Sequence, residues 1–128
     1  MIAVLRSIGG IVTGAIVAAV TYWVAAVVAF LVMHGIPLGS AGGPPTTGDV
    51  TVHLVAASAA SLGGGRLAAR IASSRPHLHA LVPGAVLGIG AFVGLSKPSS
   101  NWPDWFAYAM ASACIGGAIL AGRTARRH

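Results

Sequence analysis

Residues 8–34 read IGGIVTGAIVAAVTYWVAAVVAFLVMH, and this stretch contains no Asp, Glu, Lys or Arg. A hydrocarbon core about 30 Å thick is crossed by about 20 mostly apolar residues in a helix. The stretch is long enough to do this, and it exceeds the roughly 7–15 apolar residues of a secretory signal core. It therefore predicts a first transmembrane helix that stays in the protein.

Three further apolar stretches follow, at about residues 50–69, 78–96 and 104–122. Only 8% of the 128 residues are charged, whereas a soluble domain carries about 25%. A charge at mid-bilayer costs roughly 3 kcal/mol or more, so a chain embedded in lipid requires such a deficit. The sequence predicts an all-α integral membrane four-helix bundle, built as one four-span domain over residues 1–128.

The basic residues lie on one side of the predicted spans. Arg6 precedes the first span, and Lys97 is the one basic residue in the two loops on the other side. Positive side chains stay on the cytoplasmic side of a membrane. The sequence therefore predicts a multi-pass protein of a bacterial-type inner membrane with both termini in the cytoplasm. The other basic residues flank the central connection or follow the fourth span: Arg66, Arg70, Arg75, Arg123, Arg126 and Arg127.

The positive net charge of +6 predicts a lipid partner. Nucleic-acid binding needs a surface that combines basic and aromatic side chains, and the sequence provides none, so that class is excluded. Basic residues beside a span instead bind anionic headgroups of the cytoplasmic leaflet. We expect the six arginines named above to make these headgroup contacts.

The chain contains a weak internal repeat. LGGGRLAAR at residues 62–70 resembles IGGAILAGR at residues 115–123, and each segment ends a predicted span. The repeat unit is then an αα-hairpin, and two copies running in the same direction imply a pseudo-two-fold axis along the membrane normal. Chance similarity in a chain rich in Ala, Gly, Val and Leu is the alternative.

Small residues spaced four apart predict where helices pack. In lipid, close backbone approach holds helices together, and small side chains permit it. The third span has two such faces, one with Gly84 and Gly88 and one with Gly90 and Gly94. One face suffices for a neighbouring helix, so we expect the other to be available to a second subunit. The predicted packing residues form a glycine zipper: Gly10, Gly14, Gly65, Gly84, Gly88 and Gly117.

His34, Asp49 and His53 form the one candidate metal site. His34 ends the first span, Asp49 is placed in a loop just before the second, and His53 lies in the first turn of that span. All three are expected near the outer interface, and histidine with a carboxylate is a common metal-ligand set. The alternative is a pair of interfacial histidines bonded to headgroups, loop backbone or water.

No other residue pattern indicates chemistry. Ser58, Ser61 and Thr13 lack a neighbouring base and orienting acid, so nucleophilic catalysis is not predicted. No motif indicates a cofactor, and Cys114 is expected to act as a small apolar side chain. We expect a non-enzymatic accessory, scaffold or assembly subunit that acts through helix packing, in a homo-oligomer or with other membrane-protein subunits. The alternative is a subunit of a small oligomeric transporter or channel.

Overall fold

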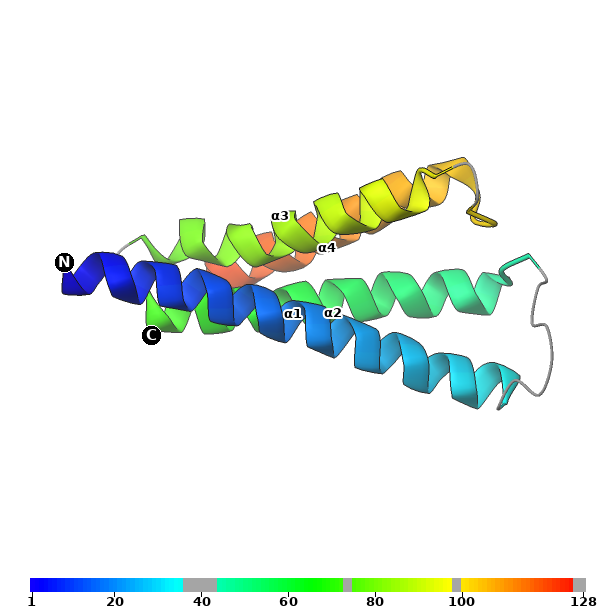
Figure 1. Cartoon of the computed structure of the whole chain (residues 1–128), viewed down its shortest axis with the longest axis horizontal. Coiled ribbons are helices and arrows are strands. Elements are labelled where there is room, and N and C mark those ends of the chain that lie inside the picture. The colour runs from blue at the N-terminus through cyan, green and yellow to red at the C-terminus, as the bar shows by residue number, and fades with distance from the viewer. Residues whose placement is uncertain (36–43, 73–74, 98–99, 126–128) are drawn as a thin grey trace.

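A computed structural model describes residues 1–35, 44–72, 75–97 and 100–125, and these ranges are helical apart from short connections. The helices run up, down, up and down, so both termini lie at one end of the molecule (Figure 1). We call this end the termini end, and the opposite one the loop end. The prediction of an all-helical four-helix bundle is confirmed. The helices are α1 (Ile2–His34), α2 (Thr47–Ile71), α3 (Pro76–Leu95) and α4 (Asp104–Ala125).

Two helix starts differ from the sequence prediction. α1 begins at Ile2, before the predicted span at residue 8, so Arg6 lies within the first turns of the helix and still precedes that span. α2 begins at Thr47, which places Asp49 inside the helix rather than in the preceding loop. The reason for the second difference is a capping box. The Thr46 side chain accepts from the Asp49 backbone, and the Asp49 side chain accepts from the Thr46 backbone, so the helix starts there.

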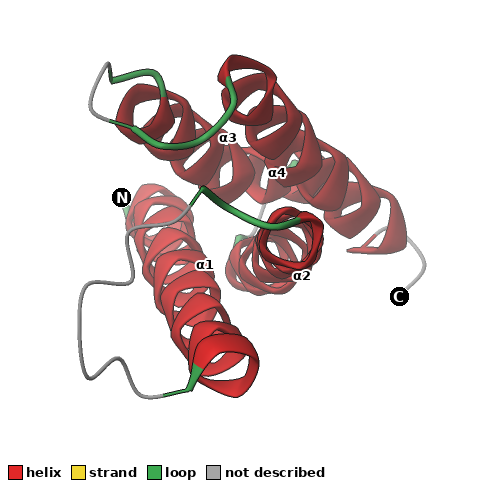
Figure 2. Cartoon of the chain, turned by 90° about the vertical axis from the view of Figure 1, so that its right-hand side faces the viewer, coloured by secondary structure: helices red, strands yellow, loops and turns green. Residues whose placement is uncertain are grey.

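Three of the helices, α1, α3 and α4, are long and apolar enough to cross a membrane. α2 is long enough at 25 residues, but it is less apolar. It packs against all three other helices, and Figure 2 shows it between α1 and the α3–α4 pair. Its buried side chains, apart from Asp49, are Ala, Ser or Gly. A helix that is covered by its neighbours needs little apolar bulk of its own, which explains the lower hydropathy of α2.

Glycines bring the helix backbones together in the half of the bundle nearest the termini end. A Cβ atom added at Gly14 would lie 2.6 Å from the Gly64 carbonyl oxygen. One added at Gly65 would lie 2.8 Å from both Ala121 Cβ and the Ala80 carbonyl oxygen. No real side chain tolerates such distances, so these positions accept only glycine without a shift of the backbone.

The other predicted packing glycines also lie at helix contacts. Gly84 faces α4, where an added Cβ would be 2.5 Å from Ala118 Cβ, and Gly117 faces the Ser58 carbonyl of α2. Gly10 and Gly88 are less crowded, with nearest atoms at 3.1 Å and 3.4 Å. Gly90 and Gly94 differ from all of these, because nothing lies within 4 Å of an added Cβ at either position. Towards the loop end, α1 diverges from α3 and α4 (Figure 1).

The two hairpins point the same way, but their packing departs from a two-fold relation. Equivalent repeat positions have similar surroundings: Gly64 and Gly117 each meet a neighbouring backbone, whereas Gly63 and Gly116 are open. Their partners differ, since Gly64 faces α1 and Gly117 faces α2. Within the described ranges, the α2 backbone also packs on that of α3, whereas the backbones of α1 and α4 do not approach each other. A strict two-fold axis would exchange α1 with α3 and α2 with α4, so the α2–α3 and α4–α1 pairs would have to pack in the same way.

Candidate functional site

The candidate site lies at the loop end and is built around Asp49. Its Oδ1 atom lies 2.7 Å from Nε2 of His34, the last residue of α1. Its Oδ2 atom accepts from the Thr46 backbone N–H and from the Thr46 hydroxyl, both at 2.7 Å. These contacts use both carboxylate oxygens. They join the end of α1 to the start of α2 across the connection between the two helices.

The environment of Asp49 favours its ionised form. Hydrogen bonds from His34 and Thr46 lower the pKa of the Asp49 carboxyl to about 2, against the partial desolvation that opposes this. The residue is 7% exposed and precedes the predicted span at residues 50–69. A negative charge is therefore held near the predicted membrane–water interface. The hydrogen bonds that stabilise this charge come from His34 and Thr46.

His53 is oriented by the same residue through a different atom. Its Nδ1 atom lies 2.8 Å from the Asp49 backbone carbonyl oxygen. A carbonyl can only accept, so Nδ1 carries the hydrogen and Nε2 is free to accept in the neutral ring. By the same reasoning, Nε2–H of His34 donates to the carboxylate and its Nδ1 is free to accept. Asp49 thus sets the orientation of two imidazoles, one with its side chain and one with its main chain.

Aromatic rings surround the His53 imidazole. The centroid of the Trp102 ring lies 4.9 Å away, and those of Tyr22 and Phe106 lie 6.1 Å and 6.4 Å away. Trp102 in turn stacks on Phe106 at 4.3 Å. The rings come from α1, from α4 and from the segment just before α4, so His53 lies where the two hairpins meet. The sequence analysis did not anticipate this cluster.

A cavity of about 670 Å³ opens beside these residues, between α1 and α2. We call it the α1–α2 cavity. Its polar lining is at the loop end and includes His34, Asp49 and His53. Farther along α1 the lining becomes apolar and includes Trp23, Val27 and Phe30. The cavity is therefore amphipathic along its length.

The structure corrects the metal-site prediction. His34 and Asp49 meet as predicted, but no group of three or more His, Cys, Asp and Glu side chains in the described part of the chain is placed to hold a metal ion. The carboxylate of Asp49 is occupied by His34 and Thr46, and His53 approaches its carbonyl instead. Asp49 therefore orients the two imidazoles and does not form a metal-ligand group with them. The sequence signal for this was the Thr-x-x-Asp pattern of a capping box at Thr46.

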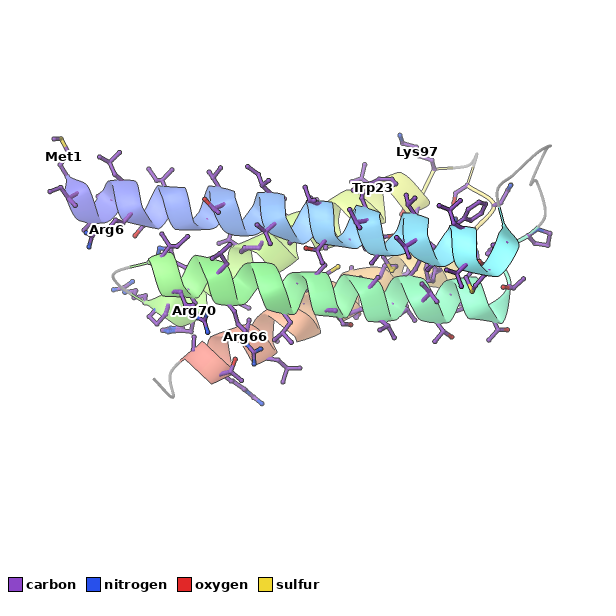
Figure 3. All side chains as sticks on the ribbon, turned by 90° about the horizontal axis from the view of Figure 1, so that it is seen from below. Met1, Arg6, Trp23, Arg66, Arg70 and Lys97 are labelled. Carbon is purple, nitrogen blue, oxygen red and sulfur yellow. The ribbon has the colours of Figure 1, made fainter. Side chains whose placement is uncertain are left out.

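Among the predicted lipid-binding arginines, Arg66 and Arg70 lie at the termini end. Figure 3 shows Arg6, Arg66 and Arg70 there, with Lys97 at the opposite end. The Arg66 Nε–H donates to the Thr124 hydroxyl at 3.1 Å, and both line a cavity of about 290 Å³ with Arg70. This bond fixes the guanidinium between α2 and α4. Arg75 and Arg123 are exposed, while Arg126 and Arg127 lie outside the described residues.

The described structure thus contains two candidate binding features. At the loop end, two oriented imidazoles lie beside the amphipathic α1–α2 cavity, and at the termini end, the Arg66 guanidinium is held by Thr124. Comparison with known proteins found no match among family models, curated proteins or solved structures.

Proposed function

We propose that this chain is a non-enzymatic accessory subunit of a bacterial-type inner membrane, and that a transmembrane helix of another subunit packs against it. The observation that supports this is an open, glycine-lined groove between α1 and α3. It has a volume of about 520 Å³, and we call it the α1–α3 groove. Its small lining residues are Ala15, Ala19, Gly90, Ala91 and Gly94.

The two glycine faces of α3 are used differently. Gly84 and Gly88 are in contact with α4. Gly90 and Gly94 line the groove and have no neighbouring atom within 4 Å of an added Cβ. Small residues at an open position let a second backbone approach closely, which is how helices associate in lipid. The groove therefore suits an apolar transmembrane helix.

The proposed orientation of the bundle in the membrane rests on the arginines at its termini end. Arg6, Arg66 and Arg70 lie at the termini end, and Lys97 lies at the loop end (Figure 3). The positive-inside rule then places both termini in the cytoplasm and the candidate site on the outer side. The Arg66 guanidinium, held by Thr124, would meet the phosphate of an anionic lipid in the cytoplasmic leaflet.

Photo-crosslinking in the native membrane tests the packing proposal. A photoreactive residue at Val86, which lines the groove, is compared with one at Ile89, an exposed residue of the same helix that does not line it. We expect a discrete crosslinked protein from position 86 only, and its loss when Gly94 is replaced by Leu. Gly63→Leu is the matched control, because Gly63 is equally open but lies on α2.

The outcome also separates the two functions considered from the sequence. A discrete partner, whether a second copy or another membrane protein, supports an assembly role. Crosslinks to lipid alone from position 86 would contradict it. The transporter alternative would instead require solute flux in proteoliposomes that contain only this chain, with a path shared between protomers.

A further inference from the structure

We infer that the α1–α2 cavity binds one amphiphile of the outer leaflet, with a primary ammonium head at Asp49, His34 and His53 and its chain along α1. This inference rests on the proposed membrane orientation. It does not depend on a helix occupying the α1–α3 groove, because Trp23 is the one described residue that lines both the groove and the cavity.

The whole cavity, from its polar end to its apolar end, has about the depth of one leaflet. His34 ends α1 at the loop end, and Trp23 lines the far part of the same cavity. At about 1.5 Å per residue, these two positions are about 16 Å apart along the helix. Half of a hydrocarbon core about 30 Å thick has almost the same depth. Val27 and Phe30 line the interval, so an acyl or alkyl chain would meet apolar side chains along its whole length.

The polar part of the cavity favours a cation that donates hydrogen bonds. Asp49 carries the negative charge, because its hydrogen bonds hold it ionised. His34 and His53 each use one N–H on Asp49, so in their neutral forms both present an acceptor nitrogen. A primary ammonium supplies three N–H donors. The remaining lining adds aromatic faces, including Trp102 and Phe30, and such faces attract cations.

The same lining is unsuited to an anionic head. It contains no Lys or Arg among the described residues. In the neutral rings the single N–H of each histidine is already bonded to Asp49, which leaves the uncharged Asn101 amide as a side-chain donor in the lining. A quaternary ammonium would gain the aromatic contacts but could donate no hydrogen bond. We therefore expect the cavity to bind a primary ammonium head more tightly than a quaternary ammonium head, and to bind either more tightly than an anionic head.

Two sources supply this chemistry, a phospholipid with an ethanolamine head and a free long-chain amine. The first test places the purified chain in nanodiscs with equal amounts of phosphatidylethanolamine, phosphatidylcholine and phosphatidylglycerol. Lipid retained after release is counted by native mass spectrometry. We expect one phosphatidylethanolamine per chain, retained several-fold more than the other two. A second arm adds dodecylammonium or dodecyltrimethylammonium to the released complex. Displacement by dodecylammonium alone assigns the site to primary ammonium from either source, and retention of phosphatidylethanolamine against it assigns the lipid.

A matched pair of histidine variants tests whether the imidazoles form the site. His53→Phe keeps a ring in the aromatic cluster and removes the acceptor. His79→Phe is the control. The Nδ1 atom of His79 lies 3.0 Å from the carbonyl oxygen of Arg75, four residues earlier, which is the same local hydrogen bond that His53 makes, but His79 lies at the termini end. We expect His53→Phe and His34→Phe to weaken retention about tenfold, as for the loss of one hydrogen bond to a charged group, and His79→Phe to leave it unchanged.

Three results would overturn the inference: equal retention of the three lipids, preference for phosphatidylglycerol, or an equal loss in the His79→Phe variant. Helical circular dichroism and melting of each variant show whether it is folded. Should His53→Phe fail to fold, His34→Phe carries the test alone, since His34 lies at the end of α1 and its side chain is about a third exposed.

Discussion

The Nε2 atom of His34 lies 2.7 Å from Oδ1 of Asp49, although the two residues are fifteen positions apart. This contact fastens the end of α1 to the first turn of α2 and holds the imidazole over the α1–α2 cavity. It combines a local feature, the capping box, with a contact between two helices. Loss of Asp49 should therefore affect both helix stability and the site.

Replacing Asp49 with Ala should lower the free energy of unfolding by about 0.5–2 kcal/mol, the range for a lost helix cap. The variant removes the acceptor for the Thr46 N–H and hydroxyl and for His34. Thermal unfolding in detergent measures the change. Asp104→Ala is the control, because Asp104 also lies in a first turn, but its side chain makes no hydrogen bond in the described structure. Equal losses in both variants would show that only the helix dipole matters.

The contribution of Asp49 to stability should depend on pH in one direction. Its folded-state pKa of about 2 is below the ordinary value of 3.8, so the folded state binds fewer protons than the unfolded state between these values. The stabilisation is therefore complete above about pH 4 and is lost as the pH falls towards 2. Melting of the wild type and of Asp49→Asn should differ at pH 6 and converge near pH 2. A constant difference across this range would contradict the assigned hydrogen bonds.

Two glycines of α3 should respond oppositely to alanine. At Gly84 an added Cβ would lie 2.5 Å from Ala118 Cβ, so Gly84→Ala must push α3 and α4 apart and destabilise the bundle. Overpacking of this kind costs about 1–3 kcal/mol. Gly90→Ala meets no atom within 4 Å and should be neutral or stabilise the helix by up to about 1 kcal/mol. Melting of the two purified variants decides, and similar losses in both would mean that α3 is rotated from the described position.

Ser61 should be replaceable by Ala without loss of stability. Its hydroxyl is fully buried, and in the described structure it makes no hydrogen bond of good geometry, the nearest candidate being the weakly accepting Cys114 thiol. Burying an unsatisfied polar group is unfavourable, so Ser61→Ala should leave the unfolding free energy unchanged or raise it by about 1 kcal/mol. Ser58→Ala is the comparison, because the Ser58 hydroxyl donates to the Leu54 carbonyl at 2.9 Å. A marked loss in the Ser61 variant would show that the hydroxyl forms a stabilising hydrogen bond with the Cys114 thiol.

The proposed orientation predicts the behaviour of reporter fusions. A reporter that is active only in the cytoplasm should work when fused after His128, and one that requires the periplasm should work when inserted at residues 42–48. Exchange of the two reporters should abolish both signals. Activity of the periplasmic reporter after His128 would reverse the orientation and move the candidate site to the cytoplasmic side.

The helices and their packing faces could largely be predicted from local patterns in the sequence. Apolar stretches predicted the four helices, and small residues four apart predicted positions that the structure places at helix contacts, such as Gly14 and Gly84. Such patterns work because a membrane helix forms its hydrogen bonds within itself and needs small residues wherever a backbone approaches. The start of α2 was missed because Thr46 and Asp49 were interpreted as loop residues, although their spacing is that of a capping box.

The candidate site depended on geometry that local patterns do not contain. His34 and Asp49 were predicted to lie near the same side of the membrane, and their side chains are in hydrogen-bond contact. The aromatic cluster around His53 could not be predicted, because it depends on how α2 is rotated relative to α1 and on the position of Trp102 before α4. The distinction between Gly84 and Gly90 likewise required knowing which face of α3 meets α4.

The divergence of α1 from α3 and α4 gives the bundle unequal cross-sections. Glycine contacts hold the helices together near the termini end, and the helices spread towards the loop end (Figure 1). In the proposed orientation, the chain occupies more area in the outer leaflet than in the inner one. Such an inclusion relieves stress where the outer leaflet is stretched, so the protein should concentrate in membrane that bulges away from the cytoplasm.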